Sequence, residues 1–260
     1  MRIAVLGSGS GGNSIVVEGV NGTRIMVDAG FSYANLSRRL SAAGIKPSSI
    51  YGVLFTHEHG DHAKGSGVFH KKHAHVPFYA NSLTAESISA QFGAPMDAFY
   101  EFSTGETFGI GEFNIQTFAT SHDVVDPVGY FIEDVNGTKL FIGTDTGVVT
   151  AGMAKWYSKA TCAVLEANYD PALLWGSSRE RSLKVRIDGP NGHLSNEASA
   201  ELVATRTGRG MKVLLAAHRS QECNEPSLVK AAMAAALAQA GRSDVELALL
   251  EQDGILAKEF

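Results

Sequence analysis

Three histidines and an aspartate fall within six consecutive positions of this chain, directly after a short apolar run that is typical of a strand. The segment is Thr56-His57-Glu58-His59-Gly60-Asp61-His62. Because side chains two apart in an extended chain point to the same side, His57 and His59 can face one metal ion together. If the chain turns at Gly60 into a helix, Asp61 and His62 point to a neighbouring position, where a second ion could bind. Imidazole and carboxylate are ligands of Zn²⁺, Mn²⁺ and Fe²⁺, so the segment predicts a metal site at the end of a strand.

The rest of the chain alternates short apolar runs with helical segments. Strands are expected at Arg2–Leu6, Ser14–Glu18, Arg24–Asp28, Gly52–Phe55, Pro77–Ala80, Phe113–Ala119, Val128–Glu133, Lys139–Gly143, Cys162–Glu166, Lys212–Ala217 and Glu246–Leu250. Helices are expected at Tyr33–Ala43, Ser82–Gln91, Leu194–Arg206 and Pro226–Ala240. A β-rich first half followed by an α/β second half indicates two sheets packed together with helices outside. No Pro- or Ser-rich linker divides the sequence, so we expect one domain over residues 1–260.

Composition and length exclude several classes of protein. The 260 residues are 44% hydrophobic and 19% charged, which is an ordinary globular mixture and not a disordered or collagen-like one. The two cysteines, Cys162 and Cys223, are too few for a disulfide framework and fit a reducing cytosol. The apolar stretch before Gly7 is too short for a secretory signal, and no run approaches the roughly 20 apolar residues of a membrane span. We therefore expect a cytoplasmic protein without membrane contact.

The glycine-rich segment Gly7–Gly12 contains the spacing G-x-G-x-x-G after a predicted strand. A dinucleotide site needs a helix to begin there, so that its N-terminal N–H groups meet the pyrophosphate. The residues Ser14–Glu18 are β-branched and predict a strand instead. We expect a tight connection between two strands, in which glycine supplies positive φ. An intermediate interpretation has Ser10–Ser14 lining a site at the strand ends.

Three further candidates for metal ligands each follow an apolar strand. They are His122, Asp145 and His218, and the strands before them end at Ala119, Gly143 and Ala217. Alone, each would more often be a surface or capping residue. Together with the histidine-rich segment they supply what a pair of ions requires.

With these residues the sequence resembles the metallo-β-lactamase superfamily over nearly its whole length. The H-x-H-x-D-H motif at positions 57–62 matches without a gap, Asp28 matches the family's early Asp, and the later motifs follow in order. The resemblance implies an αββα sandwich, an α+β fold with two packed mixed β-sheets and helices on the outer faces. It also implies a dinuclear site at one edge. By this pattern, one ion is held by His57, His59, His122 and Asp145, and the other by Asp61, His62, Asp145 and His218, with Asp145 bridging.

Two more segments resemble ribonuclease Z and its phosphodiesterase relatives. There, a His beside a helix N-terminus pairs with a Glu and serves the scissile phosphate, and the matching residues are His193 and Glu166. The alternative is that His193 only neighbours a helix cap and that Glu166 has no chemical role. The short spacing from His122 to Asp145 leaves no room for a tRNA-clamping arm, and that from Asp145 to His218 leaves none for a large inserted cap domain.

The whole sequence is most similar to the YycJ/WalJ branch of compact bacterial metal-dependent exonucleases. The segments Gly9–Ser14 and Gly192–Glu197 and the total length carry this similarity. Arg219 and Cys223 depart from the branch's usual sequence after His218, which weakens the transfer of its substrate preference to this chain.

The resemblance implies a metal-dependent phosphodiesterase, and we expect a nucleic acid substrate, with DNA favoured. Asp61 would orient an attacking hydroxide, and His193, held by Glu166, would stabilise the transition state or donate a proton to the leaving oxygen. One alternative is hydrolysis of a small ester, thioester or cyclic phosphodiester. Another is a non-catalytic regulatory protein that keeps a structural metal site. The expected cofactors are two divalent ions, with Zn, Mn and Fe all open, and the sequence does not indicate an oligomeric state.

Charge limits how such a protein can hold nucleic acid. The 27 acidic and 22 basic side chains give a formal net charge of −5, which argues against a protein that coats a polyanion. Four of the acids, Asp28, Asp61, Asp145 and Glu166, belong to the expected site, and the rest of the chain is close to neutral. The basic run Arg179–Arg186 is expected to be a solvated helix face, with a phosphate-tracking groove wall as the alternative. The segment His70–His75 is expected to be a solvated helix end, with metal or phosphate contact as the alternative.

Overall fold

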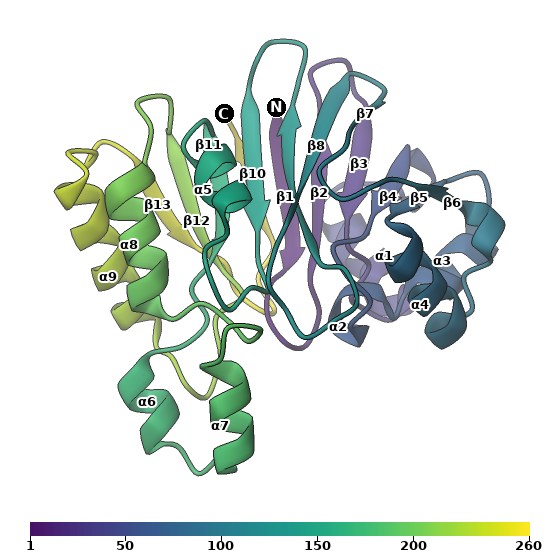
Figure 1. Ribbon diagram of the computed structural model, residues 1–260. Helices are drawn as coiled ribbons and strands as arrows, with labels where there is room; N and C mark the ends of the chain where they lie inside the picture. The colour runs from purple at the N-terminus through teal and green to yellow at the C-terminus, as the bar shows by residue number, and fades with distance from the viewer.

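Two seven-stranded β-sheets face each other at the centre of the molecule (Figure 1). The computed structural model describes residues 1–260. In order across the first sheet, the strands are β14 (Leu256–Glu259), β1 (Arg2–Gly7), β2 (Ser14–Glu18), β3 (Arg24–Val27), β4 (Gly52–Leu54), β5 (Phe78–Ala80) and β6 (Phe99–Glu101). In order across the second, they are β13 (Glu246–Leu249), β12 (Val213–Ala217), β11 (Cys162–Glu166), β10 (Lys139–Gly143), β9 (Val128–Glu133), β8 (Phe113–Ala119) and β7 (Thr107–Ile110).

Helices cover the outer face of each sheet. Those on the first sheet are α1 (Tyr33–Ala42), α3 (Ser66–Lys72) and α4 (Ser82–Phe92). Those on the second are α5 (Ala151–Tyr157), α8 (Asn196–Arg206) and α9 (Pro226–Gln239). The other helical segments are α2 (Gly60–Ala63), α6 (Pro171–Gly176), α7 (Arg181–Ile187) and the short 3₁₀ turns η1 (Pro47–Ser49) and η2 (Met96–Ala98). The αββα order of layers that the resemblance implies is therefore confirmed.

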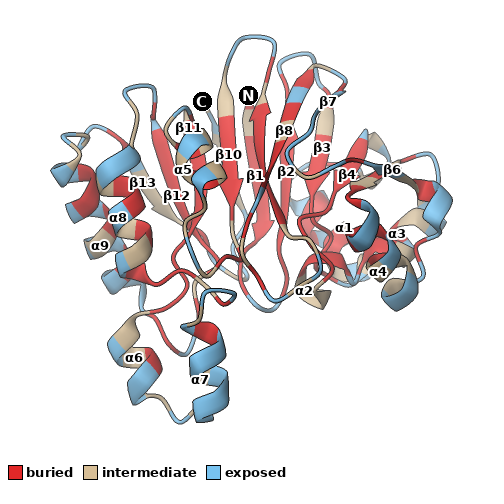
Figure 2. Cartoon of the chain, in the orientation of Figure 1, coloured by how far each residue is buried: buried red, intermediate tan, exposed pale blue.

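Three hydrophobic clusters hold the layers together. The middle cluster, of 23 buried residues, lies between the sheets and joins Ile25 and Leu54 of the first to Ile132 and Leu140 of the second. The other two lie between each sheet and its own helices. Figure 2 shows the result, in which the strands are buried along most of their length and the helices are exposed on their outer side. Burial of apolar surface on both faces of each sheet is the main stabilising contribution to such a fold.

The parallel parts of both sheets present their strand ends at one edge. In the first sheet, β3, β4, β5 and β6 pair in parallel, and in the second so do β10, β11, β12 and β13. Loops at the carboxyl ends of parallel strands are where such sheets commonly form binding sites. Helix α2 lies at this edge, and α6 and α7 project beyond it at the bottom of Figure 1.

Most expected elements agree with the structure to within two residues. The turn at Gly60 into a helix is confirmed, because α2 begins there. The glycine-rich segment connects β1 to its antiparallel neighbour β2, so the expected strand–strand connection is also confirmed. No expectation covered strands β6, β7 and β14 or helices α5 and α6, which are at most seven residues long and have weak periodicity.

Two expected boundaries were wrong for local reasons. The strand expected at Arg24–Asp28 ends at Val27, because Asp28 adopts φ 62°, outside the strand region. The helix expected at Leu194–Arg206 begins at Asn196, because the Ser195 side chain accepts a hydrogen bond from the Ala198 N–H and caps the helix there.

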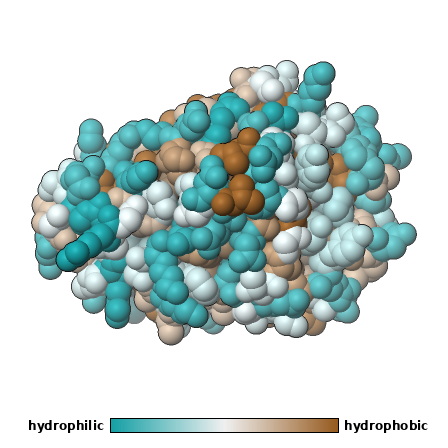
Figure 3. Space-filling view, turned by 90° about the horizontal axis from the view of Figure 1, so that it is seen from above, coloured by the Kyte–Doolittle hydropathy of each residue, from teal (hydrophilic) through white to brown (hydrophobic).

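The surface opposite the α6–α7 edge is largely hydrophilic. Seen from above, it carries one compact hydrophobic group near its middle (Figure 3). Large apolar side chains that are exposed elsewhere stand mostly alone, as is usual for globular proteins. None of the helices combines the length and the apolar character that a membrane span demands.

We predict that Leu140→Ala lowers the free energy of unfolding by about 2–5 kcal/mol, because the buried leucine lies between the sheets and its loss leaves a cavity. Val135→Ala is the matched control, since Val135 is 62% exposed at the β9–β10 turn, and we expect a change within about 0.5 kcal/mol. Urea unfolding of both variants measures the difference. Equal effects at the two positions would contradict the assignment of the inter-sheet core.

Candidate metal centre

The seven expected metal ligands meet at the edge where the parallel strands end. Two come from the β4–α2 connection, two from α2 itself, and one each follows β8, β10 and β12. Their ligand atoms fall into overlapping groups with no separation above 4.8 Å, namely His57–His59–His122, His57–His62–Asp145 and Asp61–His62–His218. A fourth group of the same compactness is Asp145–Glu166–His193–His218. Residues as far apart in the sequence as His57 and His218 therefore share one small volume, as the family pattern implies.

One side of this volume is lined by three imidazoles. The ring centroids of His57 and His59 lie 5.0 Å apart, those of His57 and His122 5.2 Å, and those of His59 and His122 5.0 Å. The rings are nearly perpendicular to one another, so their nitrogen atoms converge without the faces stacking. Three such nitrogens are typical of a catalytic zinc-type site that keeps a further position open.

Asp145 lies between the two sides. Its Oδ2 is 3.3 Å from His62 Nε2, and its Oδ1 is 3.5 Å from His218 Nδ1 and 4.0 Å from His122 Nε2. Asp61 faces the same space from α2, with Oδ2 3.6 Å from His62 Nε2 and 3.7 Å from His218 Nε2. One carboxylate thus reaches both groups of imidazoles, and the other reaches only the second.

The backbone turns sharply where it delivers these side chains. Asp28, Asp145 and His218 have φ of 62°, 56° and 52°, and no other non-glycine residue of the chain has positive φ. Each stands one or two positions after the end of a strand. Left-handed conformations are costly for residues with a Cβ and persist where surrounding structure holds them, commonly at functional sites. The turns redirect the side chains from the strand axes into the shared volume.

Most of the rings have one nitrogen fixed by a partner behind it. His62 Nδ1 donates to Asp28 Oδ2 at 2.7 Å, and Asp28 also accepts from the Thr56 N–H at 2.9 Å. His122 Nδ1 donates to the Gly192 carbonyl at 2.9 Å. His57 Nδ1 is 2.9 Å from Thr56 Oγ1. The family pattern includes Asp28 but assigns it no role. The contact with His62 shows that Asp28 orients this ring, as carboxylates do for metal-binding histidines.

Several inward-facing side-chain atoms make no hydrogen bond within the protein. His57 Nε2, His218 Nε2 and Asp145 Oδ2 are buried and make no hydrogen bond. His62 Nε2 contacts the Asn13 amide nitrogen at 3.0 Å. Buried polar atoms nearly always have a hydrogen-bond partner, so three atoms without one in the same volume indicate a ligand site. Imidazole nitrogens and carboxylate oxygens without a cysteine form a donor set that suits divalent metal ions such as Zn²⁺, Mn²⁺ and Fe²⁺.

Burial and neighbouring charges shift the pKa values of these groups strongly. Burial, followed by the nearby imidazoles, lowers the pKa of His57 well below its ordinary value. Burial acts on His62 in the same direction, but the carboxylates of Asp145, Asp28 and Asp61 outweigh it and raise the pKa of His62 to about 9. Burial opposes ionisation of Asp61, yet His62 and His218 hold its pKa below the ordinary value. Without a metal ion, the excess negative charge is thus balanced by protons on His62 and His218.

Glu166 supports two histidines at once. It is fully buried at the end of β11, and its Oε1 accepts from His193 Nδ1 at 2.7 Å and lies 3.1 Å from His218 Nδ1. Its Oε2 accepts from the Thr146 N–H at 3.0 Å. Burial raises its pKa, but His193 and His218 overcome this and hold the pKa well below the ordinary value. The expected pairing of Glu166 with His193 is confirmed, and Glu166 adds a contact to His218 that the sequence did not indicate.

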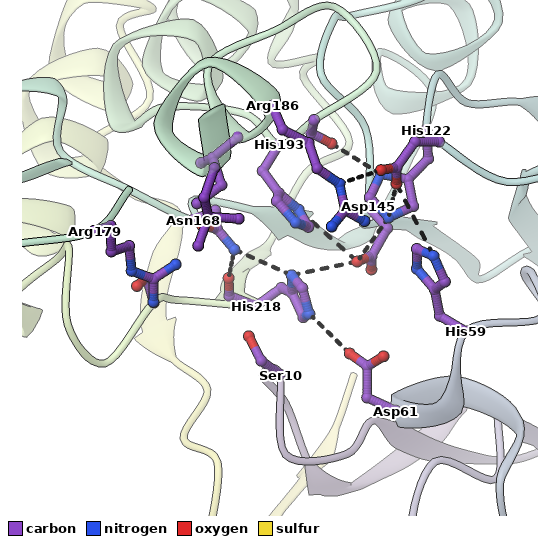
Figure 4. Close-up of a pocket in the computed structure, with 15 residues that line it drawn as sticks. Ser10, His59, Asp61, His122, Asp145, Asn168, Arg179, Arg186, His193 and His218 are labelled. Carbon is purple, nitrogen blue, oxygen red and sulfur yellow. Dashed lines mark hydrogen bonds and ion pairs between the residues drawn. The ribbon is translucent and has the colours of Figure 1, made fainter. Parts of the chain in front are cut away.

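A polar cleft of about 210 Å³ opens over this centre (Figure 4). Only two of its 15 lining residues are hydrophobic. Sequence reasoning missed Asp123, whose Oδ1 lies 3.5 Å from His122 Nε2 and 4.0 Å from His59 Nε2, and whose other oxygen accepts from Arg186 Nε. Its position directly after His122 was the one available signal. Ser10 also lines the cleft, in agreement with the intermediate interpretation of the glycine-rich segment.

The basic run Arg179–Arg186 divides into two kinds of residue. Arg179 and Arg186 line the cleft, which agrees with the alternative of a groove wall, while Arg186 also lies on an exposed face of α7, as the expected solvated helix face implies. The fold brings them there because α6 and α7 reach beyond the strand ends and α7 turns back toward His122. Lys184 instead donates to the carbonyls of Trp175 and Ser177 and ties α7 to α6, and Arg181 is exposed.

The segment His70–His75 lies apart from the metal centre. Helix α3 ends at Lys72, His75 is exposed, and His73 Nε2 is 2.8 Å from the Tyr33 hydroxyl. The expectation of a helix end outside the site is confirmed, with His73 held by Tyr33 and partly buried.

Comparison with known proteins gives consistent matches over most of the chain. A profile of the beta-lactamase superfamily domain matches residues 23–216. The chain is 35% identical over 243 residues to exodeoxyribonuclease WalJ of Streptococcus pneumoniae serotype 2, covering 92% of this chain and 89% of the relative. It is 33% identical over 242 residues to exodeoxyribonuclease YycJ of Bacillus anthracis, covering 93% and 90%. The metallo-beta-lactamase fold protein YhfI from Bacillus subtilis has the same fold, with a TM-score of 0.73 at 15% identity over 99% of this chain and 98% of YhfI.

We predict that Zn²⁺ binding at pH 7.5 releases at least one proton per chain. In the metal-free protein the pKa of His62 is about 9, so its ring is protonated at this pH, whereas coordination needs a neutral imidazole. Apparent affinity should therefore rise as the pH increases from about 7 toward 9. Calorimetric titration in two buffers of different ionisation enthalpy counts the protons.

Asp28→Asn is the matched variant for this measurement. Asparagine tolerates the left-handed backbone at this position but removes one of the three charges, after that of Asp145, that raise the pKa of His62, so fewer protons should be released. A wild-type titration without any proton release would contradict the described charge balance.

Proposed function

The chain belongs to the beta-lactamase superfamily, and from this premise we propose that it is a metal-dependent exodeoxyribonuclease. The two relatives named exodeoxyribonuclease align with about nine-tenths of the chain at 33–35% identity. The proposal therefore takes DNA as the substrate class.

One observation carries the proposal. His193 lines the same polar cleft as His59, Asp61, His122, Asp145 and His218, and it is 20% exposed. Its partner Glu166 is fully buried beneath it and does not reach the cleft. A pair of this kind is suited to acid–base work on a substrate that enters from solvent, because the carboxylate fixes the ring and the ring meets the substrate. A purely structural metal site would need no such pair at its mouth.

We assign His57, His59, His122 and Asp145 to one ion and Asp61, His62, Asp145 and His218 to a second. The support is the grouping of their ligand atoms and the three buried atoms that lack partners. Zn, Mn and Fe all fit this donor set. Two divalent ions would lower the pKa of a water between them and offset negative charge on the phosphoryl oxygens.

The protein's own residues would then direct the proton and the substrate. His193 donates from Nδ1 to Glu166 Oε1, which leaves Nε2 to donate to a phosphoryl oxygen or to the leaving oxygen. Glu166 stays ionised because its pKa is held low, so it remains an acceptor for the His193 Nδ1–H and keeps the ring oriented. Asp61, one quarter exposed, accepts a hydrogen bond from the attacking water and aligns it with the phosphorus.

We also propose a cytoplasmic location and one functional domain over residues 1–260. The first is supported by Cys162 and Cys223, which are both free and buried, as is common where thiols stay reduced. The second is supported by the central cluster, which draws on strands from both ends of the chain.

The test of function uses end-labelled double-stranded DNA, single-stranded DNA and RNA with Mn²⁺ or Zn²⁺. We expect stepwise shortening of DNA by the wild-type protein and none by Asp145→Ala, because Asp145 reaches both groups of imidazoles. Rapid hydrolysis of small esters or cyclic phosphodiesters with no loss of DNA would favour a small-molecule hydrolase. Wild-type turnover by Asp145→Ala would exclude the assigned pair of ions.

We predict that His193→Ala keeps the bound metal but loses on the order of 10²–10⁴ in the rate of DNA hydrolysis, the usual contribution of general acid–base catalysis. His75→Ala is the control, because this histidine is exposed and outside the cleft, and its rate should be unchanged. Elemental analysis checks the metal content of both variants. A normal rate in His193→Ala would remove this residue from the mechanism.

A further inference from the structure

A second polar hollow adjoins the cleft over the metal centre. It encloses about 350 Å³, and only one of its 12 lining residues is hydrophobic. The two hollows share three lining residues, Ser10, Arg179 and Ser220. A substrate longer than one phosphodiester can therefore extend from the cleft into the adjoining hollow, and it would pass Arg179 on the way.

Arg179 has an unused hydrogen-bonding edge at this wall. Its Nε donates to Glu222 Oε2 at 2.9 Å, while Nη1 and Nη2 make no hydrogen bond in the protein. Figure 4 shows the guanidinium group turned toward the space between Ser10 and His218. The Glu222 contact fixes one side of the planar group, and the two terminal nitrogens present the paired donors that suit a phosphate.

The other arginines of the second hollow are already committed. Arg39 is 6% exposed and donates to the Leu6 carbonyl at 2.6 Å and to Asp253 at 2.8 Å. Arg219 is paired with Glu251 at 3.0 Å. Arg179 is therefore the one arginine at the junction with both terminal nitrogens free.

Ser10 adds donors on the opposite side of the junction. Neither its N–H nor its hydroxyl makes a hydrogen bond in the protein. The loop that carries it is held on both sides, since the Gly9 N–H donates to Asn13 Oδ1 at 2.8 Å and the Gly11 N–H to Gln252 Oε1 at 2.6 Å. A Cβ at Gly9 or Gly11 would lie within 2.9 Å of Gln252, so glycine is needed for this close packing. The free donors of Ser10 are thus presented by a fixed loop.

We propose that Arg179 and Ser10 bind a second backbone phosphate of the nucleic acid strand, next to the phosphodiester that lies at the metal centre. The strand then runs from the cleft across the β1–β2 loop into the adjoining hollow. This inference rests on the proposed nuclease function and adds to it a determinant of binding to polynucleotides. It also explains how a protein with a net charge of −5 holds a polyanion, through a local contact rather than a basic surface.

The test combines a protein variant with a change in the substrate. Single-stranded oligonucleotides carry one uncharged methylphosphonate linkage at each of several positions from the end that is attacked. In the wild-type enzyme, a methylphosphonate at one position beside the scissile phosphodiester should raise the KM about 10- to 100-fold. This is the usual range for loss of a charge-assisted hydrogen bond. In Arg179→Met the unmodified strand should already show this higher KM, and the methylphosphonate should have little further effect.

Two companion variants make the result specific. Arg181→Met removes an exposed arginine of α7 that makes no ion pair, and it should keep both the wild-type KM and the sensitivity to the methylphosphonate. Arg179→Lys retains the charge but loses the paired donors, so its KM should lie between those of the wild type and Arg179→Met.

The outcomes separate this inference from the proposed function. If the wild-type enzyme shortens DNA but Arg179→Met keeps the same KM and the same methylphosphonate profile, the second phosphate site is wrong and the nuclease function stands. If Arg179→Met has a raised KM but retains the full methylphosphonate penalty, the arginine acts elsewhere and the inference is again wrong. If the wild-type enzyme shortens no nucleic acid, the function and the inference fail together.

Discussion

The structure depends on keeping six imidazoles, four of them buried, and several carboxylates close together at one edge of two sheets. Ionisable groups are costly to bury unless they are paired. Here the partners of the histidines lie on the side of each ring that faces away from the shared volume. Asp28 fixes His62, a backbone carbonyl fixes His122, and Glu166 fixes both His193 and His218. Three buried atoms that face inward make no hydrogen bond to the protein, and this arrangement suits divalent cations at its centre.

The backbone accepts strain to make this arrangement possible. The positive φ values of Asp28, Asp145 and His218 turn the chain just after a strand, at the positions where side chains must leave the sheet. Close packing supports them, since a Cβ at Gly30 would lie 1.7 Å from the Asp61 carbonyl oxygen. The loops that carry the centre therefore fix one another, and the sandwich beneath them supplies the stability that offsets the strain.

Sequence patterns predict the layers and the candidate ligands because both are local. An apolar run predicts a strand, and a histidine or aspartate just after it predicts a side chain at the sheet edge, which is how His122, Asp145 and His218 were found. Contacts between distant segments leave no such pattern. The partner of His62 lies 34 positions away, and Arg179 reaches the cleft only because α6 and α7 extend past the strands. Asp123 has only its position after His122 as a signal, and an acid in a polar loop is most often solvated.

The central claim is that a pair of divalent ions at this buried edge makes the chain a nuclease. The most direct measurement adds Zn²⁺ or Mn²⁺ stepwise to metal-free protein and follows both bound metal and release of nucleotides from DNA. We expect no release without metal and a rate that rises until two equivalents are bound per chain. Full activity in the presence of a strong chelator, with no metal detected in the protein, would contradict it.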